Sequence, residues 1–423
     1  MFDFDSSLLT LSEQSLARVQ SQFQRIDALT EHNQQKMLRA FVQNKVSEAM
    51  FAPTTGYGHS DWGRDTLERV FADVMDAEDA LVRHHFSCGT HTLAVALFGI
   101  LRPGDTMLCV SGTPYDTIRP VIGITEDEPD AGSLKDFGIQ YDEVALTQDG
   151  KLDFPAIEEK IRAVRPKMVY IQRSRGYSLR DSLSIDEIAK IVEITKRNSD
   201  AVVMVDNCYG EFTETREPTS VGADLIAGSM IKNPGGGIAK TGGYIAGRAD
   251  LVEKCANRLS TPGLGKEIGA TLGNTRDLFM GLFQAPHIVG EALKTACYTA
   301  SLFELLGFAA TPRSDETRHD IIQAICLGNK ANLIAFCRGL QKGSVIDSSV
   351  VPEPSAMPGY DCDVIMAGGS FTTGSTIELS ADAPLREPYA VWLQGSLNFH
   401  SAKLAVMSAA QAVLDNMNGK RAD

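Results

Sequence analysis

Two short apolar runs in the middle of the chain each end in polar residues of complementary chemistry. Residues 202–205 (VVMV) are followed by Asp206, and the run that ends at Gly228 is followed by Ser229 and Lys232. Continuously apolar runs of this length are typical of buried strands in a parallel sheet, which bind ligands at their carboxyl ends. We therefore expect a carboxylate, a hydroxyl and an amine to meet at one edge of a sheet.

This set of groups suits pyridoxal 5'-phosphate. A carboxylate can hold the pyridinium nitrogen of that cofactor protonated, and a lysine can form a Schiff base with it, so that the cofactor acts as an electron sink for carbanion chemistry. Asp206 and Lys232 are predicted for these two roles, with Lys232 as a catalytic residue. Ser229 is predicted to reach the cofactor phosphate.

A phosphate-binding P-loop is the main rival for the glycine-rich segment 235–241 (GGGIAKT). That motif needs a glycine directly before its lysine and another glycine five residues earlier. The two positions are Ala239 and Pro234 in this sequence. The segment is therefore not expected to bind a nucleoside triphosphate.

Several unusual strings carry a resemblance to a known family. They are residues 87–91 (SCGTH), 205–212 (VDNCYGEF), 229–237 (SMIKNPGGG), 281–287 (GLFQAPH) and 384–389 (PLREPY). In this order they resemble the methionine gamma-lyase-like family, also called the aluminium-resistance or cystathionine beta-lyase-like family. The matching strings span most of the chain. The resemblance implies fold-type I dependence on pyridoxal phosphate, with Lys232 as the Schiff-base residue.

The fold implied is α/β, of the aspartate-aminotransferase-like type. It has a large domain with a mostly parallel seven-stranded sheet and a smaller α+β domain at the C-terminus. Strands that alternate with helices in the sequence agree with this class. We expect an N-terminal helical segment over residues 1–55, a large cofactor-binding domain over 56–262 and the smaller domain over 263–423.

Local signals place the elements. A capping-box pattern at Thr10–Glu13 predicts the start of a helical segment that continues toward Phe51, and a second one begins at Ser184. The expected strands lie near residues 81–83, 106–110, 167–172, 202–205, 224–230, 243–246, 363–366, 376–379 and 391–393. The other expected helices include 90–101, 287–305, 317–340 and 402–417.

The segment Cys88, Gly89 and Thr90 lies where a strand turns into a helix. The first amides and the positive dipole end of a helix attract phosphate. The resembling enzymes use this loop for the cofactor phosphate, so these three residues are predicted cofactor ligands. Tyr115 follows the next strand, and the related lyases place a tyrosine there that stacks on the cofactor ring. It is also predicted as the acid for the leaving group.

Other predicted site residues come from the wider group of enzymes. A Tyr-Ser-Arg string there reaches the neighbouring subunit's cofactor, and the corresponding string here begins at Tyr57 and lacks the arginine, for which Arg64 is a candidate substitute. Tyr57 is predicted to be catalytic and to contact substrate. The resemblance thus implies a homodimer or homotetramer with sites completed across the dimer interface.

Arginines are the expected ligands of a substrate α-carboxylate, because the guanidinium group binds that planar anion through two parallel hydrogen bonds. Arg386 in the second domain is predicted for this role. Arg173 and Arg175 share one strand face by the period of two, and Arg173 is predicted to line the same cleft.

Composition excludes several classes of protein. The chain has 423 residues, of which 43% are hydrophobic and 22% are charged, and a net charge of -14. It is expected to be a cytoplasmic protein that binds neither nucleic acid nor membrane, since it lacks a basic patch, a membrane-length apolar run and a signal core. Eight cysteines without a paired spacing predict reduced thiols. The histidines form no metal-ligand pattern.

These patterns and the resemblance together predict a lyase that eliminates a thiol from a sulfur amino acid such as methionine, cystathionine or cysteine. Lys232 would take the α-proton. The sequence does not separate β- from γ-elimination. An aminotransferase on the same scaffold and a catalytically silent binding protein stay open as alternatives, although Asp206, Ser229 and Lys232 are all in place.

Overall fold

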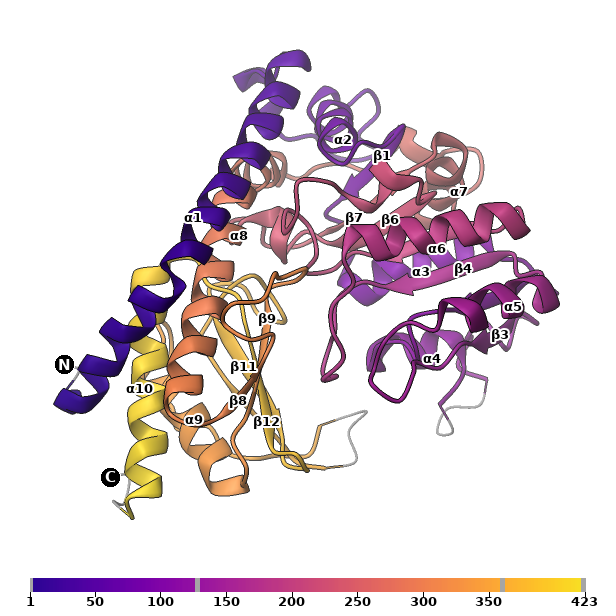
Figure 1. Ribbon diagram of the computed structural model, residues 1–423. Coiled ribbons are helices and arrows are strands. Elements are labelled where there is room, and N and C mark those ends of the chain that lie inside the picture. The colour runs from indigo at the N-terminus through magenta and orange to yellow at the C-terminus, as the bar shows by residue number, and fades with distance from the viewer. Residues whose placement is uncertain (1–2, 126–129, 358–361, 420–423) are drawn as a thin grey trace. The chain divides into compact units, whose positions relative to one another are not determined.

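The computed structural model describes residues 3–125, 130–357 and 362–419. It divides into two compact units (Figure 1), which are residues 33–284 and a second unit of residues 1–32 with 285–423. The helices α1 (Ser6–Gln43) and α8 (Thr275–Leu305) each contribute residues to both units. The limits therefore differ from the sequence-based division at residues 55 and 262.

The unit of residues 33–284 is built on a seven-stranded sheet in the order β1-β7-β6-β5-β4-β2-β3. Strands β2 to β6 pair in parallel, whereas β7 is antiparallel to both β1 and β6. The predicted mostly parallel sheet is confirmed. The strands are β1 (Asp79–Arg83), β2 (Thr106–Cys109), β3 (Gln140–Glu143), β4 (Met168–Gln172), β5 (Val202–Asp206), β6 (Leu225–Ser229) and β7 (Gly243–Gly247).

Helices cover this sheet because its central strands are apolar on both faces. All five residues of β4, β5 and β6 are buried, as expected for a parallel sheet with two covered faces. The longer helices of this unit besides α1 and α8 are α2 (Trp62–Val74), α3 (Gly89–Ile100), α5 (Phe154–Val164), α6 (Ile185–Asn198) and α7 (Ala249–Leu259), and α5 and α6 lie side by side (Figure 1). The predicted capping box at Ser184 begins α6.

One face of the sheet packs against α3 and α7. The core on this face combines residues of both helices with Val202 and Met204 of β5 and with Leu225 and Ala227 of β6. Since side chains alternate along a strand, Asp206 and Ser229 point toward the same face. In the register of the sheet, Gln172 of β4 pairs with Asp206 at the carboxyl end of β5.

The second unit is an α+β assembly. Its five-stranded sheet has the order β10-β11-β12-β9-β8 and only antiparallel pairs among the described residues. Side chains of α8, α9 and α10 form one core with this sheet. The elements are β8 (Ala309–Thr311), β9 (Ile322–Cys326), α9 (Lys330–Lys342), β10 (Val364–Ala367), β11 (Ser380–Pro384), β12 (Ala390–Gln394) and α10 (Phe399–Met417).

Short helical turns complete the description. They are α4 (Arg119–Ile122) and the 3-10 turns η1 (Glu48–Phe51), η2 (Asp116–Ile118), η3 (Pro218–Val221), η4 (Asn233–Gly235) and η5 (Gly265–Glu267). Within the described ranges, no helix is both long and apolar enough to cross a membrane.

Some local predictions were wrong. The first helix begins at Ser6, and the Thr10 hydroxyl donates to the Ser6 carbonyl inside that helix instead of capping its start. The predicted helix over 317–340 is the strand β9 followed by α9. The strand expected at 376–379 begins at Ser380, and β3 was not predicted. Short apolar runs such as 322–326 fit a helix or a strand equally well, and the antiparallel partners β12 and β8 decide between them.

Candidate active site

Lys232 lies just beyond the carboxyl end of β6, at the start of the turn η4. Its Nζ atom is 4.2 Å from the centroid of the Tyr209 ring. Tyr209 holds a left-handed backbone conformation with φ of 67°, which is unusual for a residue with a bulky side chain. The loop after β5 is thus shaped so that an aromatic ring faces the lysine.

Asp206 ends β5 with its side chain buried. Its Oδ1 accepts a hydrogen bond from the Cys208 amide at 3.1 Å, and its Oδ2 accepts one from the Tyr170 hydroxyl at 3.5 Å. Burial raises the pKa of Asp206, while the charge of Lys232 and the donated hydrogen bonds act in the opposite direction. A nearby positive charge therefore favours the ionised form of the buried Asp206 carboxyl group.

The charge balance also affects the lysine. Burial by itself lowers the pKa of Lys232, but its neighbours Cys208, Tyr209, Asp206 and Tyr115 outweigh burial, so that the pKa lies above the ordinary value. In the protein alone, these neighbours therefore favour the ammonium form of Lys232. A partner that reacts with the neutral amine must first displace this proton.

The start of α3 also lies next to the ends of β5 and β6. A Cβ atom added at Gly89 would lie 3.4 Å from Cβ of Ser229 and 3.8 Å from Sγ of Cys208. The Sγ atom of Cys88 caps the helix by accepting from the His91 amide at 3.3 Å, and the Thr90 hydroxyl lies 2.7 Å from that of Thr117. The structure thus brings the predicted phosphate loop into contact with Ser229.

Tyr115 also belongs to this group, since it is among the side chains that act on the pKa of Lys232. Its amide donates to Oε1 of Gln172 at 2.6 Å, which joins the loop after β2 to the end of β4. Its ring is 5.7 Å from that of Tyr177. Gln172 and Tyr177 were not predicted as neighbours of the site.

A buried acid on the opposite face of β6 was also not predicted. Oε1 of Glu211 accepts from the Tyr244 hydroxyl at 2.6 Å, and in the described part of the chain Oε2 has no hydrogen-bond partner. A Cβ atom at Gly228 would lie 2.7 Å from that hydroxyl, so the pair packs directly on the strand. Burial raises the pKa of Glu211 to about 8. The only sequence signal was its position, five residues after Asp206 in one loop.

Asn233 links this acid to the lysine loop. Its Nδ2 donates to the backbone carbonyl of Glu211 at 2.9 Å. The loops that follow β5 and β6, which carry Asp206 and Lys232, are thereby fastened to each other at a fully buried point. This bond fixes the spacing of the two predicted cofactor contacts.

Arg173 is completely buried in polar contacts within the unit. Its guanidinium donates to Oδ1 of Asn207 at 2.8 Å and pairs with Glu214 at 3.1 Å and with Glu217 at 3.4 Å. These contacts hold Arg173 within the unit, and its predicted contact with a substrate stays a prediction. Arg173 follows β4, which ends at Gln172, and the period of two could not show that acids from the loop after β5 surround it.

Arg175 and Arg386, the other arginines considered for the substrate carboxylate, belong to different units. Arg175 is buried, with 1% of its surface exposed. Arg386 is exposed in the turn between β11 and β12 of the other unit. Its role as a carboxylate ligand stays a prediction.

Tyr57 and Arg64 lie in the loop before α2 and at its start. The Tyr57 side chain is 72% exposed, whereas its carbonyl accepts from the Gly269 amide at 2.8 Å. Arg64 is buried, and its Nη1 donates to the carbonyls of Gly58 at 2.7 Å and Gly269 at 3.2 Å. Arg64 thus holds the loop in shape, and Tyr57 extends from that loop into solvent.

The sequence pattern of the methionine gamma-lyase family matches residues 8–414. The chain belongs to this family. A carbon-sulfur lyase involved in aluminium resistance from Clostridium novyi NT has 51% sequence identity, a TM-score of 0.93 and coverage of 96% of both chains. A protein from Bacillus cereus has 46% identity and a TM-score of 0.93, with 96% of this chain and 99% of that chain covered.

Among curated proteins, the uncharacterized protein YnbB of Bacillus subtilis strain 168 is 47% identical over 390 residues, which cover 92% of each chain. More distant structures, such as a methionine gamma lyase from Micromonospora echinospora with 18% identity and a TM-score of 0.57, share the fold. The predicted family, the α/β fold and the assignment to carbon-sulfur lyases are confirmed. Within the described ranges, no group of three or more potential ligands could hold a metal ion.

Proposed function

We propose that this member of the methionine gamma-lyase family uses pyridoxal phosphate to eliminate a thiol from a sulfur-containing amino acid. The observation that carries the proposal is the meeting of Lys232, Asp206 and the start of α3 at one edge of the large sheet. Gly89 supports the proposal because a Cβ atom at this position would lie only 3.4 Å from that of Ser229, so the start of α3 packs next to the end of β6.

The residues fit the cofactor group by group. A buried carboxylate at Asp206 suits the protonated pyridine nitrogen, and the amine of Lys232 suits the aldehyde. The amides at the start of α3, with the hydroxyls of Ser229 and Thr90, suit the phosphate. When bound, the cofactor supplies an electron sink for the negative charge that forms at the substrate α-carbon.

Lys232 and Tyr115 are the groups that move protons. The amine of Lys232 would take the proton from the substrate α-carbon. The phenol of Tyr115 would donate to the departing sulfur. The amide of Tyr115 donates to Gln172, which holds the backbone of this residue at the end of β4.

A homodimer or homotetramer, with Tyr57 serving the partner's site, forms part of the proposal. The support is the exposed side chain of Tyr57 on a loop that Arg64 holds in place. If the sites are shared, mixing two inactive variants, Tyr57→Phe and Lys232→Ala, restores activity, because some mixed dimers contain one site with both residues intact. Mixtures that stay inactive after subunit exchange would contradict a shared site.

The reaction can be tested with the purified protein and added pyridoxal phosphate. Methionine, cystathionine and cysteine would be supplied in turn, while released thiol or sulfide and keto acid are measured. Pyruvate indicates β-elimination and 2-oxobutyrate indicates γ-elimination, each with an equal amount of the sulfur product. Keto acid without a sulfur product would show transamination instead, and the absence of any product from all three would contradict the proposed substrate class.

A further inference from the structure

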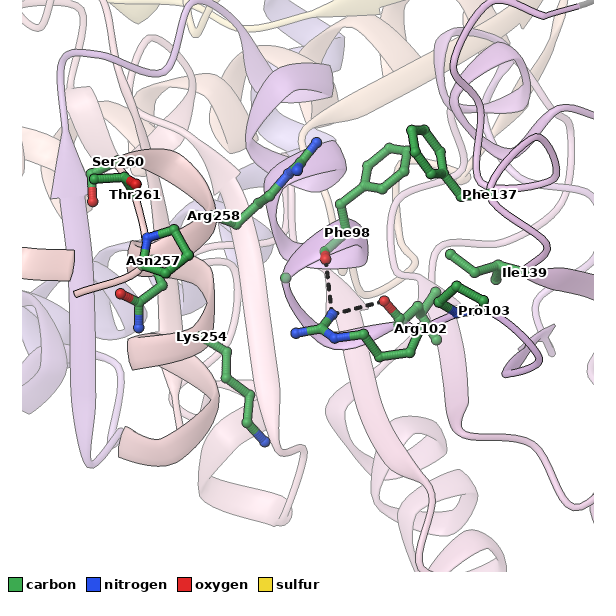
Figure 2. Close-up of a pocket in the computed structure, with 13 residues that line it drawn as sticks. Phe98, Arg102, Pro103, Phe137, Ile139, Lys254, Asn257, Arg258, Ser260 and Thr261 are labelled. Carbon is green, nitrogen blue, oxygen red and sulfur yellow. Dashed lines mark hydrogen bonds between the residues drawn. The ribbon is translucent and has the colours of Figure 1, made fainter. Parts of the chain in front are cut away.

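A second pocket opens on the large unit at the far end of α3 from the candidate active site. It lies between the carboxyl ends of α3 and α7 and the segment that leads into β3 (Figure 2), with a volume of about 400 Å³. An α-helix rises about 1.5 Å per residue, so the 12 residues of α3 separate it from Gly89 by about 18 Å. The pocket is therefore distinct from the site of Lys232.

The pocket wall is positively charged. Arg102, Lys254 and Arg258 line it, and no lining residue is acidic. Nη1 of Arg102 donates to the carbonyls of Phe98 at 3.1 Å and Leu101 at 2.8 Å, which are backbone acceptors at the end of α3. Three cations around one pocket are unexpected on a chain with a net charge of -14.

These charges are poorly compensated by the protein. In the part of the chain that the structure describes, neither Arg102 nor Arg258 forms an ion pair with a carboxylate. Lys254 approaches Asp250 only at 3.8 Å, and Asp250 also pairs with Arg248 at 3.0 Å. An anion that enters the pocket could therefore bind these cations without breaking a strong ion pair within the protein.

The rest of the wall is apolar and aromatic. Phe98 and Phe137 are in edge contact, with ring centroids 5.8 Å apart, and Phe137 is 56% exposed. The guanidinium carbon of Arg258 lies 5.0 Å from the centroid of Phe98, so that a cation and an aromatic ring form one continuous surface. Covering these exposed groups would remove apolar area from water.

We propose that this pocket binds a small organic anion with a flat apolar body. Its carboxylate, sulfonate or phosphate group would lie between Arg102 and Lys254, which extend from opposite sides of the pocket in Figure 2. Its apolar body would lie against Phe98 and Phe137. The volume is within the usual range of small-molecule sites. The proposal does not depend on the reaction carried out at Lys232.

The probe for the test is 8-anilinonaphthalene-1-sulfonate, an aromatic sulfonate whose fluorescence rises in apolar surroundings. It would be titrated into the protein already saturated with pyridoxal phosphate. We expect saturable binding that Arg258→Glu weakens by tenfold or more, which is about 1.4 kcal/mol. Phe137→Ala should weaken it as well, and this exposed side chain can be removed without loss of core packing.

Lys190→Glu is the matched control. Lys190 also lies over a phenylalanine, 3.7 Å from the centroid of Phe154, but it is outside the pocket, and its substitution changes the net charge by the same amount. Equal binding by the wild type, Arg258→Glu and Phe137→Ala would overturn the proposal, as would an equal loss in Lys190→Glu. The proposal would also be overturned if the wild type binds no dye and Arg258→Glu changes the oligomeric state. The pocket would then lie in a contact between two copies of the chain.

Discussion

The amine of Lys232 lies over the ring of Tyr209, with 4.2 Å between Nζ and the ring centroid, in a loop whose left-handed turn at Tyr209 is needed to present that ring. A cation over an aromatic face is stabilised by about 0.5 to 2 kcal/mol, depending on its exposure to solvent. Tyr209 therefore helps to keep Lys232 protonated and fixed in the protein without its cofactor.

Replacing Tyr209 with alanine should lower the pKa of Lys232, by about one unit if the full cation–π contribution is lost. The cofactor-free variant would then react with added pyridoxal phosphate at a lower pH than the wild type. The measurement is the rate of appearance of the visible absorption band as a function of pH. Tyr209→Phe keeps the ring face and loses only the hydroxyl, so its pH profile should lie between those of the wild type and the alanine variant. Identical pH profiles for the alanine variant and the wild type would contradict this role.

Asp206→Asn should reduce elimination by about 10²-fold or more, because a neutral amide cannot hold the cofactor ring protonated. Turnover would be measured at saturating cofactor, so that weaker cofactor binding does not imitate the effect. Tyr170→Phe is the matched control. It removes only a long hydrogen bond of 3.5 Å to the same carboxylate and should change activity little. Equal activity in Asp206→Asn and the wild type would exclude the proposed contact.

Glu211 should make the folded protein less stable as the pH rises. Its folded pKa is about 8 against an ordinary value of 4.5, so the folded state keeps a proton that the unfolded state has lost. The free energy of unfolding should therefore fall between about pH 5 and about pH 8. The fall is about 1.4 kcal/mol for each unit by which the pKa of Glu211 in the folded state exceeds its pKa in the unfolded state. Asp206 and Glu217, whose pKa values are also raised by burial, contribute in the same direction.

Glu211→Gln tests this expectation by urea unfolding at several pH values. The amide oxygen still accepts from Tyr244, but the group no longer titrates, so the fall in stability with pH should be shallower than in the wild type. Parallel stability curves for the two proteins would show that Glu211 has an ordinary pKa.

Arg173→Met should destabilise the large unit by about 3 to 5 kcal/mol, because it leaves the buried Glu217 without its cation. The control is Arg197→Met, since Arg197 pairs with Glu158 at the surface and should contribute at most about 1 kcal/mol. Chemical unfolding would compare the two variants. A higher KM with unchanged stability in Arg173→Met would instead favour the substrate contact that the sequence suggested.

The main groups of the site could be predicted because parallel strands deliver their ends to one edge. The apolar runs before Asp206, Ser229 and Lys232 indicated that these residues meet, whereas the prediction for Gly89 also needed the resemblance to the family. Glu211 could not be found in this way, because its partner Tyr244 comes from a strand that is adjacent only in the folded sheet.

The errors in the second unit have a similar cause. Residues 322–326 became a strand because β12 and β8 pair with them, and pairing over such distances in the chain leaves no local signal. The continuous helix α1 was predicted with the wrong start, since a Thr-x-x-Glu pattern also occurs inside helices.

The role of Lys232 is tested most directly by the visible absorption spectrum of the purified protein with pyridoxal phosphate, recorded beside that of Lys232→Ala. We predict a yellow protein whose band shifts when a sulfur amino acid is added, and a variant that lacks the band although it is folded. A colourless wild-type protein, or a variant with the same band as the wild type, would contradict the assignment of Lys232 as the residue that binds the cofactor.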